Sequence, residues 1–238
     1  MTTGPTTPLK DIALSHPDAA RILESFRLDY CCGGRKPLAE ACAAAGLAVD
    51  EVLATLAATP GAADAEPGIE QDSLNALIRF IVDTHHAFTR TELLRIDSLL
   101  TKVVDRHAAA HPELTAIGAR FRSLQADLEP HLGKEERILF PYIALLEDYR
   151  AGSSLKPEAC FGTIDNPLGQ MQAEHESVGA LLGEIRSLSA DFKPPADACA
   201  SYRTVLQALE GLEADLMRHI HLENNVLFPR ARQLADGL

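Results

Sequence analysis

The stretch HLGKEERILFP, residues 131–141, has a second copy in HIHLENNVLFP, residues 219–229. Each copy contains a histidine followed four positions later by a glutamate: His131 with Glu135, and His219 with Glu223. Residues spaced by four lie one above the other on a helix, so each copy directs an imidazole and a carboxylate to the same side. Because both copies also share Leu-Phe-Pro at matching places, the pattern indicates an internal repeat.

A further histidine precedes each copy at a similar distance. His85 lies 46 positions before His131 (131 − 85), and His175 lies 44 positions before His219 (219 − 175). All of these histidines and the two glutamates occur where an apolar residue would continue a core-facing stripe. His86 follows His85 directly, so in a regular helix it is expected to face about 100° away, towards the surface. His221 is expected to point away from the His219 face for the same reason.

The six core-facing residues predict a metal site. Buried imidazoles and carboxylates are costly unless they are partnered, and metal coordination satisfies them together. Four histidines and two glutamates suit two adjacent ions, with two histidines on each ion and Glu135 and Glu223 bridging. Positions then remain open for an oxo or hydroxo bridge, dioxygen or another diatomic. Ligation without thiolate suits iron, manganese or zinc, and we favour iron because a bridged pair in a bundle core serves redox chemistry.

Apolar residues recur at spacings of three and four in four long segments. These run over residues 72–107, over residues 112–149, from Pro167 onward, and after Pro194 and Pro195 to about Leu234. This periodicity predicts an all-α fold with a four-helix bundle over residues 69–238. Three prolines fall inside the pattern, at Pro130, Pro141 and Pro229, and are expected to cause kinks or local breaks near the site.

Residues 1–58 are predicted to form a small helical domain. Short helical patterns cover Pro17–Phe26, Lys36–Ala45 and Val49–Ala58. Helices of this length are marginal alone in water, so they must pack together. TPGAADAEPG, residues 59–68, breaks the periodicity and reads as a linker to the bundle.

The composition narrows the class of protein. With a formal net charge of −12 and a pI of about 5.2, the chain lacks the basic surface that nucleic acids or anionic membranes require. No secretory signal or membrane-spanning run is visible, and the five cysteines suggest no disulfide framework. We therefore expect a cytoplasmic protein whose partners are metal ions, small molecules or proteins.

The motif DYCCGG, residues 29–34, and the second repeat copy, HIHLENNVLFPR, together resemble the Repair of Iron Centres (RIC) family. That family combines an N-terminal ScdA-like cysteine domain with a hemerythrin-like bundle. The resemblance implies a cytoplasmic homodimer that restores iron-sulfur clusters damaged by nitrosative or oxidative stress, through iron donation or nitric oxide chemistry. It also implies that two iron ions are held by the six residues named above: His85, His131, Glu135, His175, His219 and Glu223.

By the same resemblance, Cys31 and Cys32 are candidate redox or iron-transfer thiols. The alternative is two small buried residues at a glycine-rich turn. Cys42, Cys160 and Cys199 match no motif.

Several functions remain open at the level of sequence. The main prediction is a repair factor whose partners are damaged iron-sulfur proteins, with nitric oxide or dioxygen as small ligands. One alternative is a hemerythrin-like module that binds or senses dioxygen or nitric oxide. Another is a di-iron nitric oxide reductase or peroxidase with turnover of its own. A zinc hydrolase is the least favoured, because no general base accompanies the site.

Overall fold

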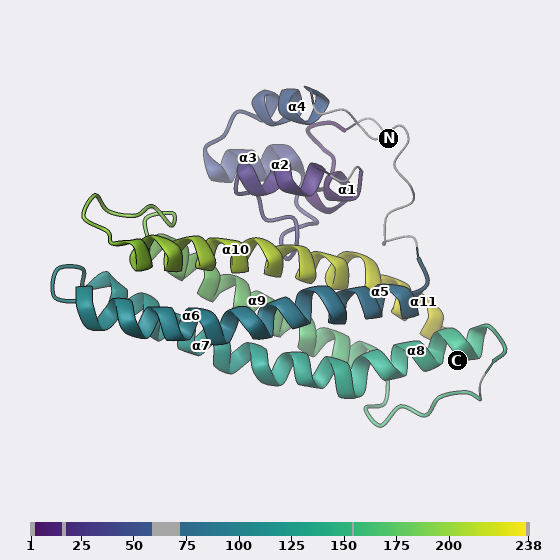
Figure 1. Cartoon of the computed structure of the whole chain (residues 1–238). Helices are drawn as coiled ribbons and strands as arrows, with labels where there is room; N and C mark the ends of the chain where they lie inside the picture. Colours follow the sequence, from purple (N-terminus) through teal and green to yellow (C-terminus); the bar gives the residue numbers. More distant parts are fainter. Residues whose placement is uncertain (1–2, 16–17, 59–71, 154, 237–238) are drawn as a thin grey trace.

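The computed structural model describes residues 3–15, 18–58, 72–153 and 155–236. Within these ranges every named element is a helix, and the only β-type pairing is an isolated bridge between Pro8 and Pro37. The all-α prediction is therefore confirmed. Figure 1 shows a long four-helix bundle with a small helical unit beside it.

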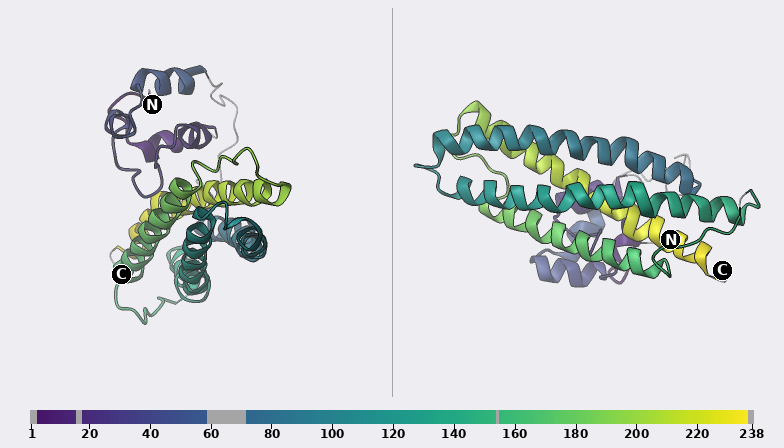
Figure 2. Two further views of the ribbon diagram at one scale, coloured as in Figure 1. Left: turned by 90° about the vertical axis from the view of Figure 1, so that its left-hand side faces the viewer. Right: turned by 90° about the horizontal axis from the view of Figure 1, so that it is seen from below.

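The bundle is made of four helical rods, which lie side by side in the two further views of Figure 2. The first joins α5 (Leu74–Phe80), η2 (Ile81–His86) and α6 (Ala87–His107), and the second joins α7 (Glu113–Lys134), η3 (Glu135–Leu139) and α8 (Phe140–Arg150). The third is α9 (Asp165–Leu188), and the fourth joins α10 (Ala200–Leu222), η4 (Glu223–Leu227) and α11 (Phe228–Ala235). Helix α6 packs against α7 and α10, and α9 packs against the same two helices. The rods follow the predicted segments closely, although α10 begins only at Ala200, some way after the two prolines.

Three of the rods contain a π-helical turn, η2, η3 or η4, in which a backbone N–H bonds five residues back. Phe140 N–H donates to the Glu135 carbonyl, and Phe228 N–H donates to that of Glu223. Pro141 and Pro229 lie two residues after the ends of these turns, so the helix departs from regular α geometry just before each of them. A proline lacks a donor and crowds the carbonyl four residues back, which a wider turn relieves. Pro130, by contrast, lies within α7, which continues through it.

The bundle core has two apolar clusters with a polar layer between them. One cluster packs Leu93, Phe121, Val178 and Leu216 with their neighbours towards the α6–α7 turn. The other packs residues of α5, α8, α11 and the start of α9, including Phe140 and Phe228. The predicted ligands on α7, α9 and α10 fall between the two clusters, so apolar packing encloses them from both ends of the bundle.

The N-terminal unit contains α1 (Leu9–Ala13), α2 (Ala19–Ser25), α3 (Leu38–Ala45) and α4 (Val49–Ala58), which share one apolar core. The first of these was not predicted, because five residues are too few to show a period. The predicted linker, residues 59–68, lies outside the described residues, so the domain division stays a prediction. No single described helix is long and apolar enough to cross a membrane; α3 and α4 meet that criterion only as a pair bent by 120°.

Candidate metal centre

The polar layer contains four histidines and two glutamates that are almost fully buried: His86, His131, Glu135, His175, His219 and Glu223. Their nitrogen and oxygen atoms form two groups, each with all donor atoms within 4.8 Å of one another. His86 and His219 belong to the first group, and His131 and His175 belong to the second. Glu135 and Glu223 belong to both. The layer is therefore built as two adjacent sites that share their carboxylates.

The imidazoles face one another in pairs. His86 Nε2 lies 3.1 Å from His219 Nε2, and the same atoms of His131 and His175 are also 3.1 Å apart. Glu223 spans the two pairs, because its Oε1 lies 3.0 Å from His219 Nε2 and its Oε2 lies 3.1 Å from His175 Nε2. Glu135 Oε2 lies 3.4 Å from His131 Nε2 and 3.5 Å from His86 Nε2. All six side chains thus converge on one small volume.

The outer nitrogens of three imidazoles have partners that fix their tautomers. His86 Nδ1 lies 2.7 Å from Glu136 Oε1, and His131 Nδ1 lies 2.9 Å from Glu174 Oε2. His175 Nδ1 lies 3.0 Å from Asn224 Oδ1, which can only accept. An acceptor at Nδ1 holds the proton there and leaves the Nε2 lone pair directed into the layer. Each of these partners is the immediate chain neighbour of a central residue on another helix.

Burial favours the neutral form of two histidines in the layer, His131 and His219. Burial and the neighbouring His175 lower the pKa of His131 to about 4, and burial lowers the pKa of His219. Burial and the charge of Glu223 hold the pKa of Glu135 well above its usual range. Neutral imidazoles are the form that binds metals, and two carboxylates crowded together disfavour ionisation unless a cation lies between them.

The donor set fits a multivalent cation. Neither carboxylate oxygen of Glu135, nor Oε2 of Glu223, accepts a hydrogen bond from any described residue. Two unprotonated Nε2 atoms at 3.1 Å would also repel each other through their lone pairs unless a cation lay between them. A buried carboxylate without partners costs several kcal/mol. A bound cation would satisfy the orphaned oxygens and the facing nitrogens at once.

The prediction that His86 faces the surface is wrong. His86 is fully buried in the layer, whereas His85 lies beside it and outside both donor groups. The cause is η2, because its π turn adds one residue: His85 and His86 are both buried there, and His86 is the one whose ring reaches the donor groups. The sequence carried a signal for this: the stripe of α6, traced back from Leu93 in steps of four and three, reaches Thr89 and then His86.

His85 has a different set of contacts. Its Nδ1 lies 2.9 Å from Asp215 Oδ1, and its ring stacks on that of His219 with centroids 5.8 Å apart. No sequence pattern marks Asp215, because its partner His85 is 130 positions away in the chain. Asp215 thus holds the His85 ring in place, and that ring in turn packs against the ring of His219.

Cys31 and Cys32 lie apart from the polar layer, in the turn of DYCCGG. Their sulfurs are 3.9 Å apart and both thiols are free. The carboxylate of Asp29 accepts hydrogen bonds from the backbone N–H groups of Cys31, Cys32 and Gly33. The Cys32 thiol and burial raise the pKa of Cys31 well above its usual range. The structure does not bring these thiols into contact with the six buried donors.

The turn is nevertheless attached to the helix that carries the second repeat copy. Asn225 Nδ2 donates to the carbonyls of Tyr30 at 3.3 Å and Cys31 at 3.2 Å. The rings of Tyr30 and His221 pack edge to face with centroids 5.0 Å apart. His221 does point away from the His219 face, as expected. Its ring is buried against the N-terminal unit and does not face solvent.

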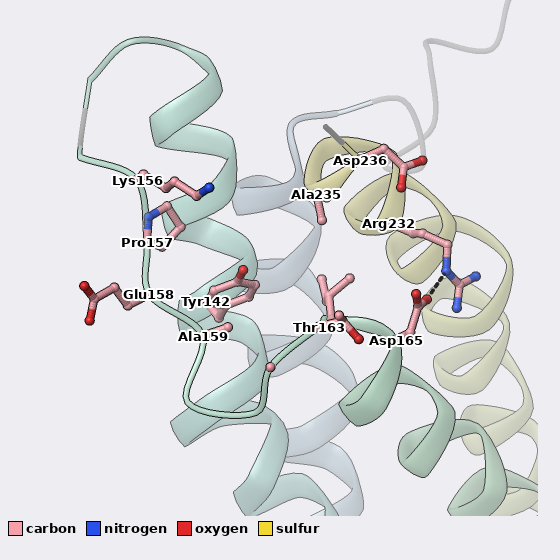
Figure 3. A pocket seen from close by; sticks show the side chains of 12 residues that line it. Tyr142, Lys156, Pro157, Glu158, Ala159, Thr163, Asp165, Arg232, Ala235 and Asp236 are labelled. Carbon is pink, nitrogen blue, oxygen red and sulfur yellow. Dashed lines mark hydrogen bonds and ion pairs between the residues drawn. The ribbon is translucent and has the colours of Figure 1, made fainter. Parts of the chain in front are cut away.

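A surface pocket of about 810 Å³ lies elsewhere, between the α8–α9 connection and α11 (Figure 3). Side chains of both charges line it, and Arg232 Nε lies 2.6 Å from Asp165 Oδ1 across one edge. None of the predicted site residues borders this pocket.

Comparison with known proteins decides the family. Residues 77–231 match the hemerythrin HHE cation binding domain, which is more than half of the chain. The chain belongs to the hemerythrin HHE family. Residues 6–59 match a second family, ScdA_N, described as a domain of unknown function (DUF542). Both matches confirm the predicted resemblance, and the buried histidines and glutamates fit the iron binding of a hemerythrin HHE protein.

Relatives within the hemerythrin HHE family match over nearly the whole chain. The iron-sulfur cluster repair protein YtfE of Edwardsiella ictaluri (strain 93-146) is 36% identical over 227 residues, which is 94% of this chain and 96% of that protein. The proteins of the same name from Escherichia coli O1:K1 / APEC and Escherichia fergusonii are each 35% identical over 228 residues, with the same shares covered. This hemerythrin HHE protein is therefore similar to iron-sulfur cluster repair proteins over almost its whole length.

Proposed function

We propose that this protein binds two iron ions and repairs iron-sulfur clusters damaged by nitrosative or oxidative stress. The observation that carries the proposal is the pair of donor groups that share Glu135 and Glu223. The similarity to iron-sulfur cluster repair proteins over 94% of the chain supports the repair role.

In this proposal each iron is held by one facing pair of imidazoles. His86 and His219 would hold the first ion, His131 and His175 would hold the second, and Glu135 and Glu223 would be available to both. Bound iron would supply one-electron redox chemistry and would bind nitric oxide or dioxygen, or leave as cargo for a damaged cluster. Two nitrogens and two shared carboxylates give each ion fewer than six protein ligands, so room remains for a small ligand.

The chain's own residues orient the donors and exclude water. Glu136, Glu174 and Asn224 hold protons at the outer nitrogens, which keeps the inner lone pairs free. The two apolar clusters close the layer from both ends of the bundle. Lys134 and Gln170 also bond to Glu174, so that carboxylate is fixed in place beside His131.

Cys31 and Cys32 are proposed to assist iron transfer or electron delivery. Asn225 links their turn to the helix that carries Glu223, two residues away. Loss of both thiols in a Cys31→Ala, Cys32→Ala variant is expected to impair repair while the iron content stays at the level of the unmodified chain. Normal repair by that variant would exclude the role.

We further propose that the protein is a cytoplasmic homodimer that acts on damaged iron-sulfur proteins. The acidic composition, with a net charge of −12, favours protein clients over nucleic acid. Size-exclusion chromatography with light scattering tests the dimer directly.

The function is tested by restoring a client. An enzyme that depends on a [4Fe–4S] cluster is inactivated with nitric oxide and then mixed with the iron-loaded full chain. We expect the activity of the client enzyme to return. We expect no recovery of activity with the metal-free chain or with a His131→Ala, His219→Ala variant. Reversible gas binding without client recovery would favour the sensing module instead. Sustained consumption of nitric oxide or peroxide with a reductant, again without recovery, would favour the reductase or peroxidase.

A further inference from the structure

A second group of chemically active side chains lies at the far end of the bundle, where the α6–α7 turn meets the α9–α10 connection (Figure 1). Cys199 is the N-cap of α10 and Asp197 lies in the connection before it, whereas His107 ends α6 and His111 lies in the α6–α7 turn. His107 Nε2 lies 3.2 Å from Cys199 Sγ. The start of α10 and Glu223 are separated by the length of that helix, roughly 35 Å, so this group is independent of the polar layer.

We propose that Cys199 is a reactive thiol that small peroxides oxidise to a sulfenic acid, with His107 as its proton acceptor and donor. A nucleophilic thiol and an imidazole within hydrogen-bond distance form the pair that activates cysteine in many proteins.

The two partners lie at the ends of two long helices. Cys199 is the N-cap of α10, a 23-residue helix, and its side chain makes no capping hydrogen bond, so the sulfur is available to His107. His107 is the last residue of α6, a 21-residue helix. The pair therefore lies between the amino end of one helix dipole and the carboxyl end of another.

The surrounding groups leave His107 available to the sulfur. The two nearby carboxylates are taken up by His111, whose Nε2 lies 3.1 Å from Asp197 and whose Nδ1 lies 3.1 Å from Glu113. The ring of Tyr202, which is itself buried, lies against His107 with centroids 5.9 Å apart. This contact orients the imidazole without competing for its Nε2.

Three of the other cysteines differ from Cys199 in burial or in their partners. Burial raises the pKa of Cys42, and the Cys32 thiol together with burial raises that of Cys31. Cys160 is exposed like Cys199, but no described imidazole lies within hydrogen-bond distance of its sulfur. Cys160 is thus a matched reference inside the same molecule.

The reaction balances without another reagent. The Cys199 thiolate attacks one oxygen of hydrogen peroxide, so that an S–O bond forms and the O–O bond breaks. The sulfur is oxidised by two electrons and the peroxide is reduced. The leaving hydroxide takes the proton from the His107 imidazolium and departs as water, which leaves Cys199 as the sulfenic acid.

The test compares two cysteines in one protein. The full chain is exposed to a small excess of hydrogen peroxide with dimedone, and labelling of the Cys199 and Cys160 peptides is measured by mass spectrometry. Alkylation by iodoacetamide, measured in the same way, reports the thiolate without metal-centred chemistry. We expect Cys199 to react about tenfold faster than Cys160, or more, in both assays.

Two variants separate the dyad from simple exposure. His107→Leu is expected to bring Cys199 down to the rate of Cys160, whereas Arg106→Leu, at the exposed neighbouring position, is expected to leave the ratio unchanged. Equal labelling of the two cysteines in the unmodified chain would overturn the proposal. So would preferential alkylation without dimedone labelling, or a His107→Leu variant that keeps the preference.

Discussion

At the scale of single residues, each central imidazole uses its two nitrogens differently. The inner Nε2 atoms converge on the layer, and the outer Nδ1 atoms of three histidines contact Glu136, Glu174 and Asn224. The exception is His219, whose buried Nδ1 has no partner among the described residues and whose ring stacks on His85 instead. Two adjacent histidines therefore have different roles: His86 is a donor of the polar layer, and His85 packs against the ring of another donor, His219.

The neighbouring histidines provide a direct test of that assignment. His86→Ala removes an inner nitrogen, so we expect it to lose about half of the bound iron or more, as one of two sites loses a ligand. His85→Ala removes the contact with Asp215 and the ring that stacks on His219 but no donor of either group, so it is expected to keep its iron. Elemental analysis of protein purified without added metal measures both. Full iron content in His86→Ala together with loss in His85→Ala would return the assignment to the regular helical register.

A second prediction concerns the outer partner of His131. Although burial alone would raise the pKa of Glu174, hydrogen bonds from Lys134, Gln170 and His131 lower it to about 2, so it is an anion at neutral pH. Glu174→Ala removes the acceptor that holds the His131 tautomer, and iron affinity is expected to fall about 10-fold to 100-fold. Competition with a coloured chelator gives the affinity. Glu176→Ala, on the exposed side of α9, is the matched control and should bind iron normally.

At the scale of elements, close backbone approach decides where glycine is needed. The turn of DYCCGG lies so near to α1 that a Cβ on Gly34 would meet the Tyr30 carbonyl oxygen at 2.4 Å and Lys10 Cβ at 2.9 Å. Gly211 lies on the exposed face of α10 with nothing within 4 Å of a Cβ. The same substitution should therefore have opposite effects at these two positions.

We expect Gly34→Ala to lower the free energy of unfolding by about 1–3 kcal/mol, because the backbone must shift to accept the methyl group. Gly211→Ala is expected to raise it by about 0.5–1 kcal/mol, since alanine is the better helix former. Urea denaturation followed by circular dichroism measures both values. An unchanged midpoint for Gly34→Ala would mean that the turn relaxes easily and is not held against α1.

At the scale of the whole molecule, burial of neutral histidines links stability to pH. The pKa of His131 and that of His221 are both lowered from 6.5 to about 4, in each case chiefly by burial. Between pH 6.5 and about pH 4 the unfolded chain binds more protons than the folded chain. The free energy of unfolding therefore decreases as the pH falls through this range. Each histidine contributes on the order of 3 kcal/mol to this loss.

Urea denaturation of the chelated, metal-free chain across this range measures the effect. Burial of Glu135 acts in the opposite sense, because a raised carboxyl pKa removes stability as the pH rises. The informative comparison is therefore with His221→Phe, which keeps a ring against Tyr30 but cannot titrate. Its stability should depend on pH less steeply than that of the unmodified chain, and an identical slope would contradict the assignment of a buried neutral His221.

The all-α bundle could be predicted from sequence, because apolar periodicity and the repeat of His-x-x-x-Glu are local properties of a helix. The same local spacing predicted five of the six residues of the polar layer, namely His131, Glu135, His175, His219 and Glu223. The sixth was assigned to His85 on the assumption of a regular helix, whereas the π turn shifts the register by one residue and places His86 in the layer. The packing of the helices accounts for the contacts between distant segments, such as His85 with Asp215, Asn225 with the cysteine turn, and His107 with Cys199. Such contacts depend on how whole helices pack against one another, and no spacing along the chain encodes that packing directly.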